Sequence, residues 1–148
     1  MEVLNMTTAR KYQEINITTA SPMELVVFLY DECIRTLEKA EQAFEIAEPN
    51  RIEAISNSLL HAQDIITELA VSLDMERGGE IAHNLQRLYD FMVNHLSQAN
   101  IKKEVQPIRD VRKMMTDLKE AWTEVAKKEP PREEAPAGYA RSGIHIAG

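Results

Sequence analysis

The chain has 148 residues, and its 17 Lys and Arg against 24 Asp and Glu give a formal net charge of −7 at pH 7. This acidic balance disfavours a nucleic-acid partner, because phosphates require a basic face. The longest apolar run, Leu25 to Tyr30, is far shorter than the ~20 residues of a membrane-spanning helix, and Met1 to Lys11 lacks the apolar segment of a signal peptide. The single cysteine, Cys33, fits a reducing compartment. We therefore expect a cytoplasmic protein with no nucleic-acid partner and no membrane insertion.

The first predicted helix covers about residues 22–47. Glycine and proline bound or break helices, so the stretches between them are the candidate elements. Residues 21–24, with the sequence Ser-Pro-Met-Glu, form a capping box with proline at the first helical position, which satisfies the free amides of a helix start. No strand pattern competes with the helices.

The second predicted helix covers about residues 50–73, and the third covers about residues 80–99. Asn50 is followed by Arg, Ile and Glu, which repeats the capping pattern. Gly78 and Gly79 are predicted to form the turn between these two helices, because a glycine pair interrupts a helix.

The fourth predicted helix covers about residues 107–127, with a proline at its start. Residues 128–148 begin with a charged, proline-rich run and contain few apolar side chains, so they are predicted to form a disordered tail. The predicted organisation is therefore an N-terminal arm over residues 1–20, a helical domain over residues 21–127 and this tail.

Apolar residues recur every three or four positions in the second and fourth predicted helices, which is the period of one buried helical face. Helices of about 20 to 27 residues joined by short links favour antiparallel neighbours. The sequence thus predicts an all-α fold, an antiparallel four-helix bundle with up-down-up-down connections. The repeating positions are Ile52, Ile55, Leu59, Ala62, Ile66, Leu69 and Leu73, then Ile108, Val111, Met115, Leu118, Trp122 and Val125.

The first and third predicted helices carry more apolar residues than one buried face needs. On a helical wheel the apolar arc spans roughly 140° in the fourth helix but roughly 200° in the third, and it exceeds half the circumference in the front half of the first. Leu60 and Val71 also lie off the core stripe of the second helix. Another copy, another segment of this chain or a partner helix is expected to cover this surface, unless the core is simply wide with tyrosine hydroxyls at its rim.

The segment before the first helix carries Tyr12, Ile15 and Ile17 among polar residues. It is expected to lie extended, or as one helical turn, against the bundle. Two interpretations remain open: a removable cover over the surplus apolar surface, and a permanently packed arm.

The sequence offers no constellation of catalytic residues. Glu80 and His83 form one Glu-x-x-His pair, whereas a carboxylate-bridged metal site in a bundle needs two. Neither His61 nor His95 is followed by the lysine typical of a phosphotransfer histidine. Cys33 lies on the core stripe of its helix, where a thiol is a poor nucleophile. We therefore expect no enzyme activity, no metal and no cofactor.

Several short motifs follow one another in a fixed order across the four predicted helices. In this order and spacing they resemble the FliS family of flagellar export chaperones, which bind flagellin, and the resemblance extends from about Tyr12 to Val125. The motifs are Tyr12-Gln13, Thr19-Ala20-Ser21-Pro22-x-Glu24-Leu25, Leu29-Tyr30-Asp31, Ala62-Gln63-Asp64-Ile65-Ile66-x-Glu68-Leu69, Gly79-Glu80-Ile81-Ala82-x-Asn84-Leu85-x-x-Leu88-Tyr89-Asp90-Phe91-Met92, Leu96-x-x-Ala99-Asn100 and Ala121-Trp122.

The resemblance implies a helical bundle that binds the C-terminal segment of flagellin, partly as helices in apolar grooves. It implies that the protein prevents premature polymerisation and assists type III export without a cofactor, and components of the export gate are further possible partners. Relatives often carry a tyrosine where this chain has Ala9, and their tails are shorter. Carried over by motif, the partner-binding residues are Tyr12 and Ile17 in a mobile arm and Tyr30, Leu85, Tyr89 and Val93 in groove walls.

A second class of function stays open from the residues alone. A self-associating bundle with a structural or adaptor role would bury the surplus apolar surface in a homodimer and would have no need of flagellin. The expected state without a client is a monomer or a weak homodimer.

Overall fold

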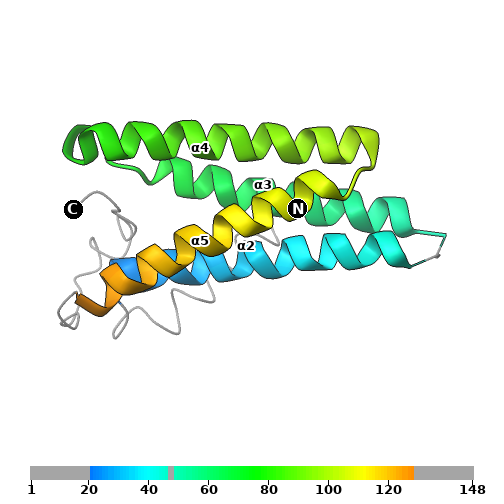
Figure 1. Cartoon of the computed structure of the whole chain (residues 1–148), viewed down its shortest axis with the longest axis horizontal. Helices are drawn as coiled ribbons and strands as arrows, with labels where there is room; N and C mark the ends of the chain where they lie inside the picture. Colours follow the sequence, from blue (N-terminus) through cyan, green and yellow to red (C-terminus); the bar gives the residue numbers. More distant parts are fainter. Residues whose placement is uncertain (1–20, 47–48, 129–148) are drawn as a thin grey trace, which may run out of the picture.

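The computed structural model describes residues 21–46 and 49–128, which form four α-helices (Figure 1). They are α2 (Pro22–Glu45), α3 (Arg51–Val71), α4 (Met75–Lys102) and α5 (Gln106–Lys128). No strand occurs in this part of the chain, so the predicted all-α fold is confirmed. None of the four helices combines the length and the apolar character needed to cross a membrane. The predicted arm, residues 1–20, and residues 129–148 of the predicted tail lie outside the described residues.

The start of α2 is the predicted capping box. The backbone amide of Glu24 donates to the hydroxyl of Ser21 at 3.2 Å, and the amide of Ser21 donates to the carboxylate of Glu24 at 3.0 Å. Pro22 occupies the first turn, where a backbone N–H would have no partner within the helix, so the N–H that proline lacks costs no hydrogen bond. Local sequence therefore fixes where the first helix begins.

The turn between α3 and α4 lies earlier than predicted. α4 begins at Met75, because the carboxylate of Asp74 accepts the amides of Glu76 and Arg77 at 3.2 and 3.0 Å and so caps the helix. Gly79 instead breaks the helix from within, at φ 52° and ψ −131°, a conformation that costs glycine little. The glycine pair thus marks a kink inside α4. Asn50 also departs from the prediction, since its side chain makes no capping bond to α3.

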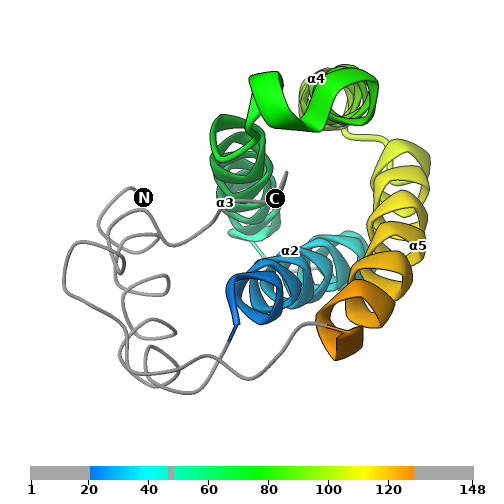
Figure 2. The ribbon, with the colours of Figure 1, turned by 90° about the vertical axis from the view of Figure 1, so that its left-hand side faces the viewer.

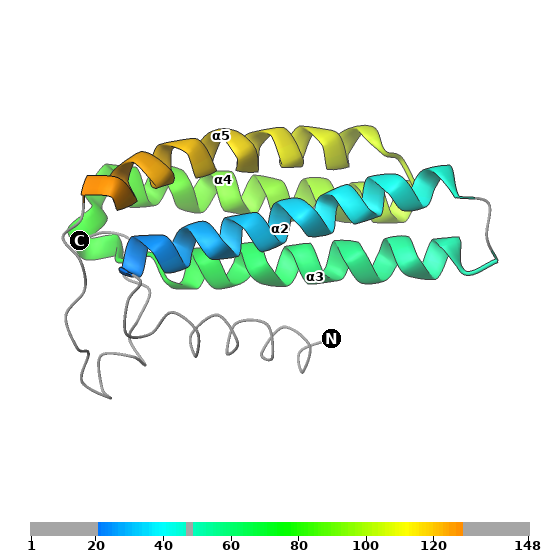
Figure 3. The same ribbon diagram turned by 90° about the horizontal axis from the view of Figure 1, so that it is seen from below.

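The four helices pack as a ring, α2 on α3, α3 on α4, α4 on α5 and α5 on α2. Figure 2 looks along the bundle and shows the helices at the corners of a square. Figure 3 shows α2 between α3 on one side and α5 on the other, with α4 behind. Sequential helices are antiparallel because short connections such as residues 72–74 reverse the chain. The predicted up-down-up-down bundle is confirmed.

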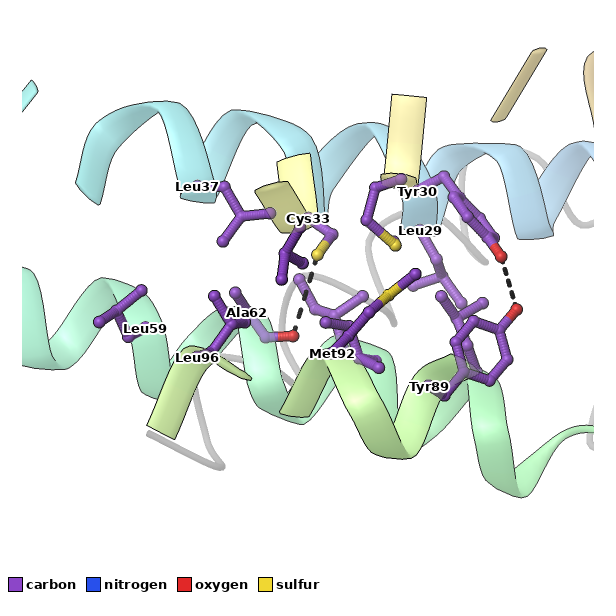
Figure 4. Close-up of a cluster of buried hydrophobic side chains, with 14 of the residues drawn as sticks. Leu29, Tyr30, Cys33, Leu37, Leu59, Ala62, Tyr89, Met92 and Leu96 are labelled. Carbon is purple, nitrogen blue, oxygen red and sulfur yellow. Dashed lines mark hydrogen bonds between the residues drawn. The ribbon is translucent and has the colours of Figure 1, made fainter. Parts of the chain in front are cut away.

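Apolar side chains from all four helices fill the centre of the ring. The core also contains polar atoms that find partners within it. The hydroxyls of Tyr30 and Tyr89 lie 2.5 Å apart, and the thiol of Cys33 donates weakly to the carbonyl of Ala62 at 3.9 Å. Figure 4 shows both contacts among labelled neighbours, which are Leu29, Leu37, Leu59, Met92 and Leu96.

The last helix, α5, crosses the bundle, beginning beside α4 and ending beside α2 (Figures 1 and 2). Its fully buried residues are Ile108, Val111 and Met115, all in its first half. Further along, Trp122 is half-buried and Val125 is 41% exposed, so the predicted core stripe does not extend to the end of the helix. Ion pairs to α2 hold α5 along its length, Glu41 with Arg112 and Asp31 with Lys119.

Candidate partner-binding surface

Two of the predicted groove residues, Tyr30 and Tyr89, meet in the core rather than at the surface. Both side chains are fully buried, and the indole N–H of Trp122 donates to the Tyr30 hydroxyl at 3.1 Å. Trp122, Tyr30 and Tyr89 therefore form a chain of hydrogen bonds that joins α5, α2 and α4. Burial raises the pKa of Tyr30 well above its ordinary value and raises the pKa of Tyr89 to about 12, so both phenols are neutral near pH 7.

A pocket of about 380 Å³ lies between α3 and α4, and two of the predicted residues, Tyr89 and Val93, line it. Tyr89 contributes to its floor while its hydroxyl points away to Tyr30 (Figure 4). Leu85, one turn before Tyr89, is 8% exposed and does not line the pocket. The other lining residues are Ile66, Thr67, Ala70, Val71, Gln86, Asp90 and Asn94.

This pocket exists because small and apolar side chains face each other across the two helices. Ala70 and Ile66 line it from α3, with Ile66 also part of the buried core, and Val93 lines it from α4. The amide of Gln63 donates to the carbonyl of Val93 at 2.9 Å and to the hydroxyl of Ser97 at 2.8 Å, which fixes α3 against α4 beside the pocket.

The apolar residues predicted to lie off the core stripe of α3 are exposed on the same side of the molecule as this pocket. Val71, which lines the pocket, is 80% exposed, and Leu60, three helical turns earlier, is 44% exposed. The sequence did not reveal Ala70 as a lining residue. The available signal was a small residue next to Val71, yet its partner on α4 depends on the packing of the two helices.

A second pocket, of about 330 Å³, lies between the start of α2 and the end of α5. Val27 and Phe28, part of the predicted surplus of the first helix, line it together with Ala126 and Thr123. Its rim carries charges of both signs, Glu24 and Lys127. The sequence indicated the α2 side of this pocket and gave no sign of the α5 side.

The surplus apolar residues of α4 also reach the flank that faces α5. Ile81 is 70% exposed and Phe91 is 49% exposed, and the Phe91 ring stacks on His95 with 4.8 Å between ring centroids. His95 pairs in turn with Asp110 of α5 at 3.1 Å. Hydrogen bonds from Gln106 and His95 lower the pKa of Asp110.

The histidines and the cysteine that were considered for metal binding or catalysis are not arranged as a metal site or a reactive centre in the described residues. Within residues 21–46 and 49–128 no group of three His, Cys, Asp or Glu side chains is arranged to hold a metal ion. His83 is exposed, and His61 is packed against Glu32 at 3.2 Å. Burial raises the pKa of the Cys33 thiol, which keeps it protonated and unreactive.

The fold and its surface define a helical-bundle binding module, with apolar hollows between neighbouring helices and an exposed apolar rim. Comparison with known proteins gives the family. The family described as flagellar protein FliS matches residues 5–129 of this chain. The chain therefore belongs to the FliS family of flagellar secretion chaperones.

Relatives named flagellar secretion chaperone FliS match along most of their length. The protein of Bacillus subtilis is 33% identical over 140 residues, which cover 95% of this chain and 100% of the relative. The protein of Salmonella typhimurium is 35% identical over 116 residues, covering 78% of this chain and 84% of the relative. The protein of Vibrio cholerae is 38% identical over 109 residues, covering 74% and 78%.

Proposed function

We propose that this chain binds the C-terminal segment of flagellin in the cytosol. In doing so it keeps flagellin from polymerising prematurely and assists its delivery to the type III export apparatus. Membership of a family of flagellar secretion chaperones supports a role in export. The choice of flagellin as client rests on the resemblance of the sequence motifs.

The observation that carries the proposal is the apolar surface between α3 and α4. Tyr89 and Val93 line a pocket there, and Val71 stands 80% exposed at its edge. An exposed aliphatic side chain at the edge of an apolar hollow extends the apolar surface, and a surface that receives a helix from a client needs both features.

The remaining predicted residues have distinct roles in this proposal. Tyr12 and Ile17 belong to an N-terminal arm, residues 1–20, which covers or contacts the client surface. Leu85 and Tyr30 are buried in the core and hold α4 in place beneath the pocket, Tyr30 through its hydrogen bond to Tyr89. The helical domain, residues 21–127, carries the surface, and the proline-rich tail is not needed for binding.

A direct test mixes the purified full chain with the last few dozen residues of flagellin from the same organism. Light scattering should show a one-to-one complex, and calorimetry should give its affinity. Val71→Asp should weaken binding about tenfold, because it places a charge at the apolar edge while the exposed position leaves the fold intact. Ile52→Asp is the matched control, since this isoleucine is 59% exposed in the first turn of α3 and lines neither pocket.

The competing function, a homodimer that buries the same surface, predicts a different result. The chain alone would scatter as a dimer at micromolar concentration, Val71→Asp would dissociate it, and the flagellin peptide would not bind. That outcome would refute the proposed client and leave a self-associating bundle.

A further inference from the structure

The pocket between α3 and α4 carries one charge, and that charge is negative. Among its nine lining residues Asp90 is the only ionisable carboxyl or amine, and none of the nine is Lys, Arg or His. The Asp90 carboxylate accepts a long hydrogen bond, 3.4 Å, from the amide of Gln86 on the same helix. In the described residues no cation forms an ion pair with Asp90. Asp90 therefore makes no ion pair at the rim of this apolar hollow, although Arg87 lies one helical turn before it on α4.

The shape of the surface fits a helix of defined length. Leu60 and Val71 are eleven residues apart on α3, which is about 16 Å along the helix axis or three turns. Both are exposed, on the α4 side of the core stripe of α3. The hollow between α3 and α4 has Ala70 on one wall and Val93 on the other. A helix lying between two antiparallel helices presents side chains on one face at positions i, i+4, i+7 and i+11, and these cover the three turns from Leu60 to Val71.

We infer that this surface binds an amphipathic helix of about three turns whose apolar face is flanked by a lysine or arginine opposite Asp90. The inference rests on the proposed function and specifies the chemistry of the client segment that this surface selects. The apolar face packs on Ala70, Val71 and Val93 and supplies most of the affinity. The cation fixes the direction and register of the helix, as charges at the edge of an apolar contact do.

A second copy of this chain fits the same surface poorly. A twofold interface centred on the pocket would bring the surface around Asp90 of one copy against the same surface of the other. Two carboxylates would then approach with no basic residue among the lining side chains to separate them. Charge complementarity therefore favours a basic partner over self-association.

The experiment measures binding of the C-terminal flagellin peptide to the full chain and to three variants. Asp90→Asn removes the charge and keeps the shape, and Thr67→Trp fills the hollow from an exposed lining position. Asp117→Asn, an exposed carboxylate on α5, is the control. Asp90→Asn should weaken binding about two- to fivefold in about 0.05 M salt, and this loss should shrink in about 0.5 M salt. Thr67→Trp should weaken binding at least about tenfold, and the control should leave it unchanged.

The basic residue of the client is identified by a double-mutant cycle. Each lysine and arginine of the peptide is replaced by glutamine in turn. One replacement should weaken binding to the wild-type chain and have no further effect on the Asp90→Asn variant. If no replacement behaves in this way, the assignment of a cation opposite Asp90 is wrong.

The remaining outcomes separate this inference from the proposed function. If the wild-type chain binds no peptide, the proposed function and the inference are both refuted. If it binds but neither Asp90→Asn nor Thr67→Trp weakens binding, only the inference is refuted. Tighter binding to Asp90→Asn would show that the carboxylate disfavours the client and faces no cation. A fall in molecular mass of free Thr67→Trp, with unchanged peptide affinity, would assign the surface to a second copy. Either result overturns the inference.

Discussion

Replacing Tyr30 by phenylalanine tests the hydrogen-bond chain at the centre of the bundle. The substitution removes one oxygen that accepts from Trp122 and pairs with Tyr89. Trp122 is only half-buried, so water can replace its lost partner at little cost. Tyr89 is fully buried and its hydroxyl is left unpaired, which costs roughly 1 to 3 kcal/mol.

The expected result is a decrease in the free energy of unfolding of about 2 kcal/mol for Tyr30→Phe, or a melting temperature about 5 to 10 °C lower. Tyr89→Phe should also destabilise the fold, but by less, since the buried Tyr30 hydroxyl loses its bond to Tyr89 and keeps the bond from Trp122. The double variant should lose less than the sum of the two single losses, because no buried hydroxyl is left unpaired. Urea unfolding followed by circular dichroism measures all four proteins.

Two results would refute this reasoning. One is a Tyr30→Phe variant within about 0.3 kcal/mol of the wild type. The other is a double variant whose loss equals the sum of the single losses, because this would mean that the two phenols contribute independently.

The remaining predictions concern binding, the two terminal segments and alkaline pH. Leu85→Ala should weaken flagellin binding by about 1 to 3 kcal/mol in calorimetry, provided that circular dichroism shows an intact fold, which must be checked because this leucine is buried. Deleting residues 130–148 should leave the melting temperature and the affinity for flagellin nearly unchanged, because burying their few apolar side chains would not offset the conformational entropy lost on ordering. A large loss of either would contradict this. A chain that starts at Thr18 should bind the client more tightly and self-associate more if the arm is a cover, whereas weaker binding by an unchanged monomer would place the arm in the binding site. Burial raises the pKa of Tyr89 from the usual 10.0 of a tyrosine to about 12, so its contribution to stability is complete below about pH 10 and is lost between about pH 10 and 12; Tyr89→Phe should flatten this part of a pH titration of stability.

Local chemistry made much of this fold predictable from the sequence. The capping box at Ser21 fixed the start of α2, and the spacing from Ile55 to Leu73 identified the buried face of α3. The prediction failed where two local signals competed. The glycine pair predicts a turn, but the carboxylate of Asp74 caps α4 before it, and Gly79 only kinks the helix.

The candidate site was harder to predict because it depends on which helices face each other. A tyrosine on a wide apolar arc suits either a core or a groove wall, and the choice for Tyr30 depends on a partner 59 positions away, Tyr89. The pocket beside Tyr89 needs Ala70 of α3 and Val93 of α4 to face the same hollow, and that arrangement is set by interhelical packing such as the Gln63 bridge. Exposure of Val71, in contrast, followed directly from its place off the core stripe of α3.

The position of Trp122 has a practical consequence for spectroscopy of this protein. It is the only tryptophan of the chain, and it lies on the second half of α5, where no side chain is fully buried. Its indole emission therefore reports on the contact between the end of α5 and Tyr30, while the ellipticity of the four helices reports on the bundle as a whole. Fluorescence thus monitors a local edge of the molecule and not its core, and labels intended to follow the binding surface belong on α3 or α4 instead.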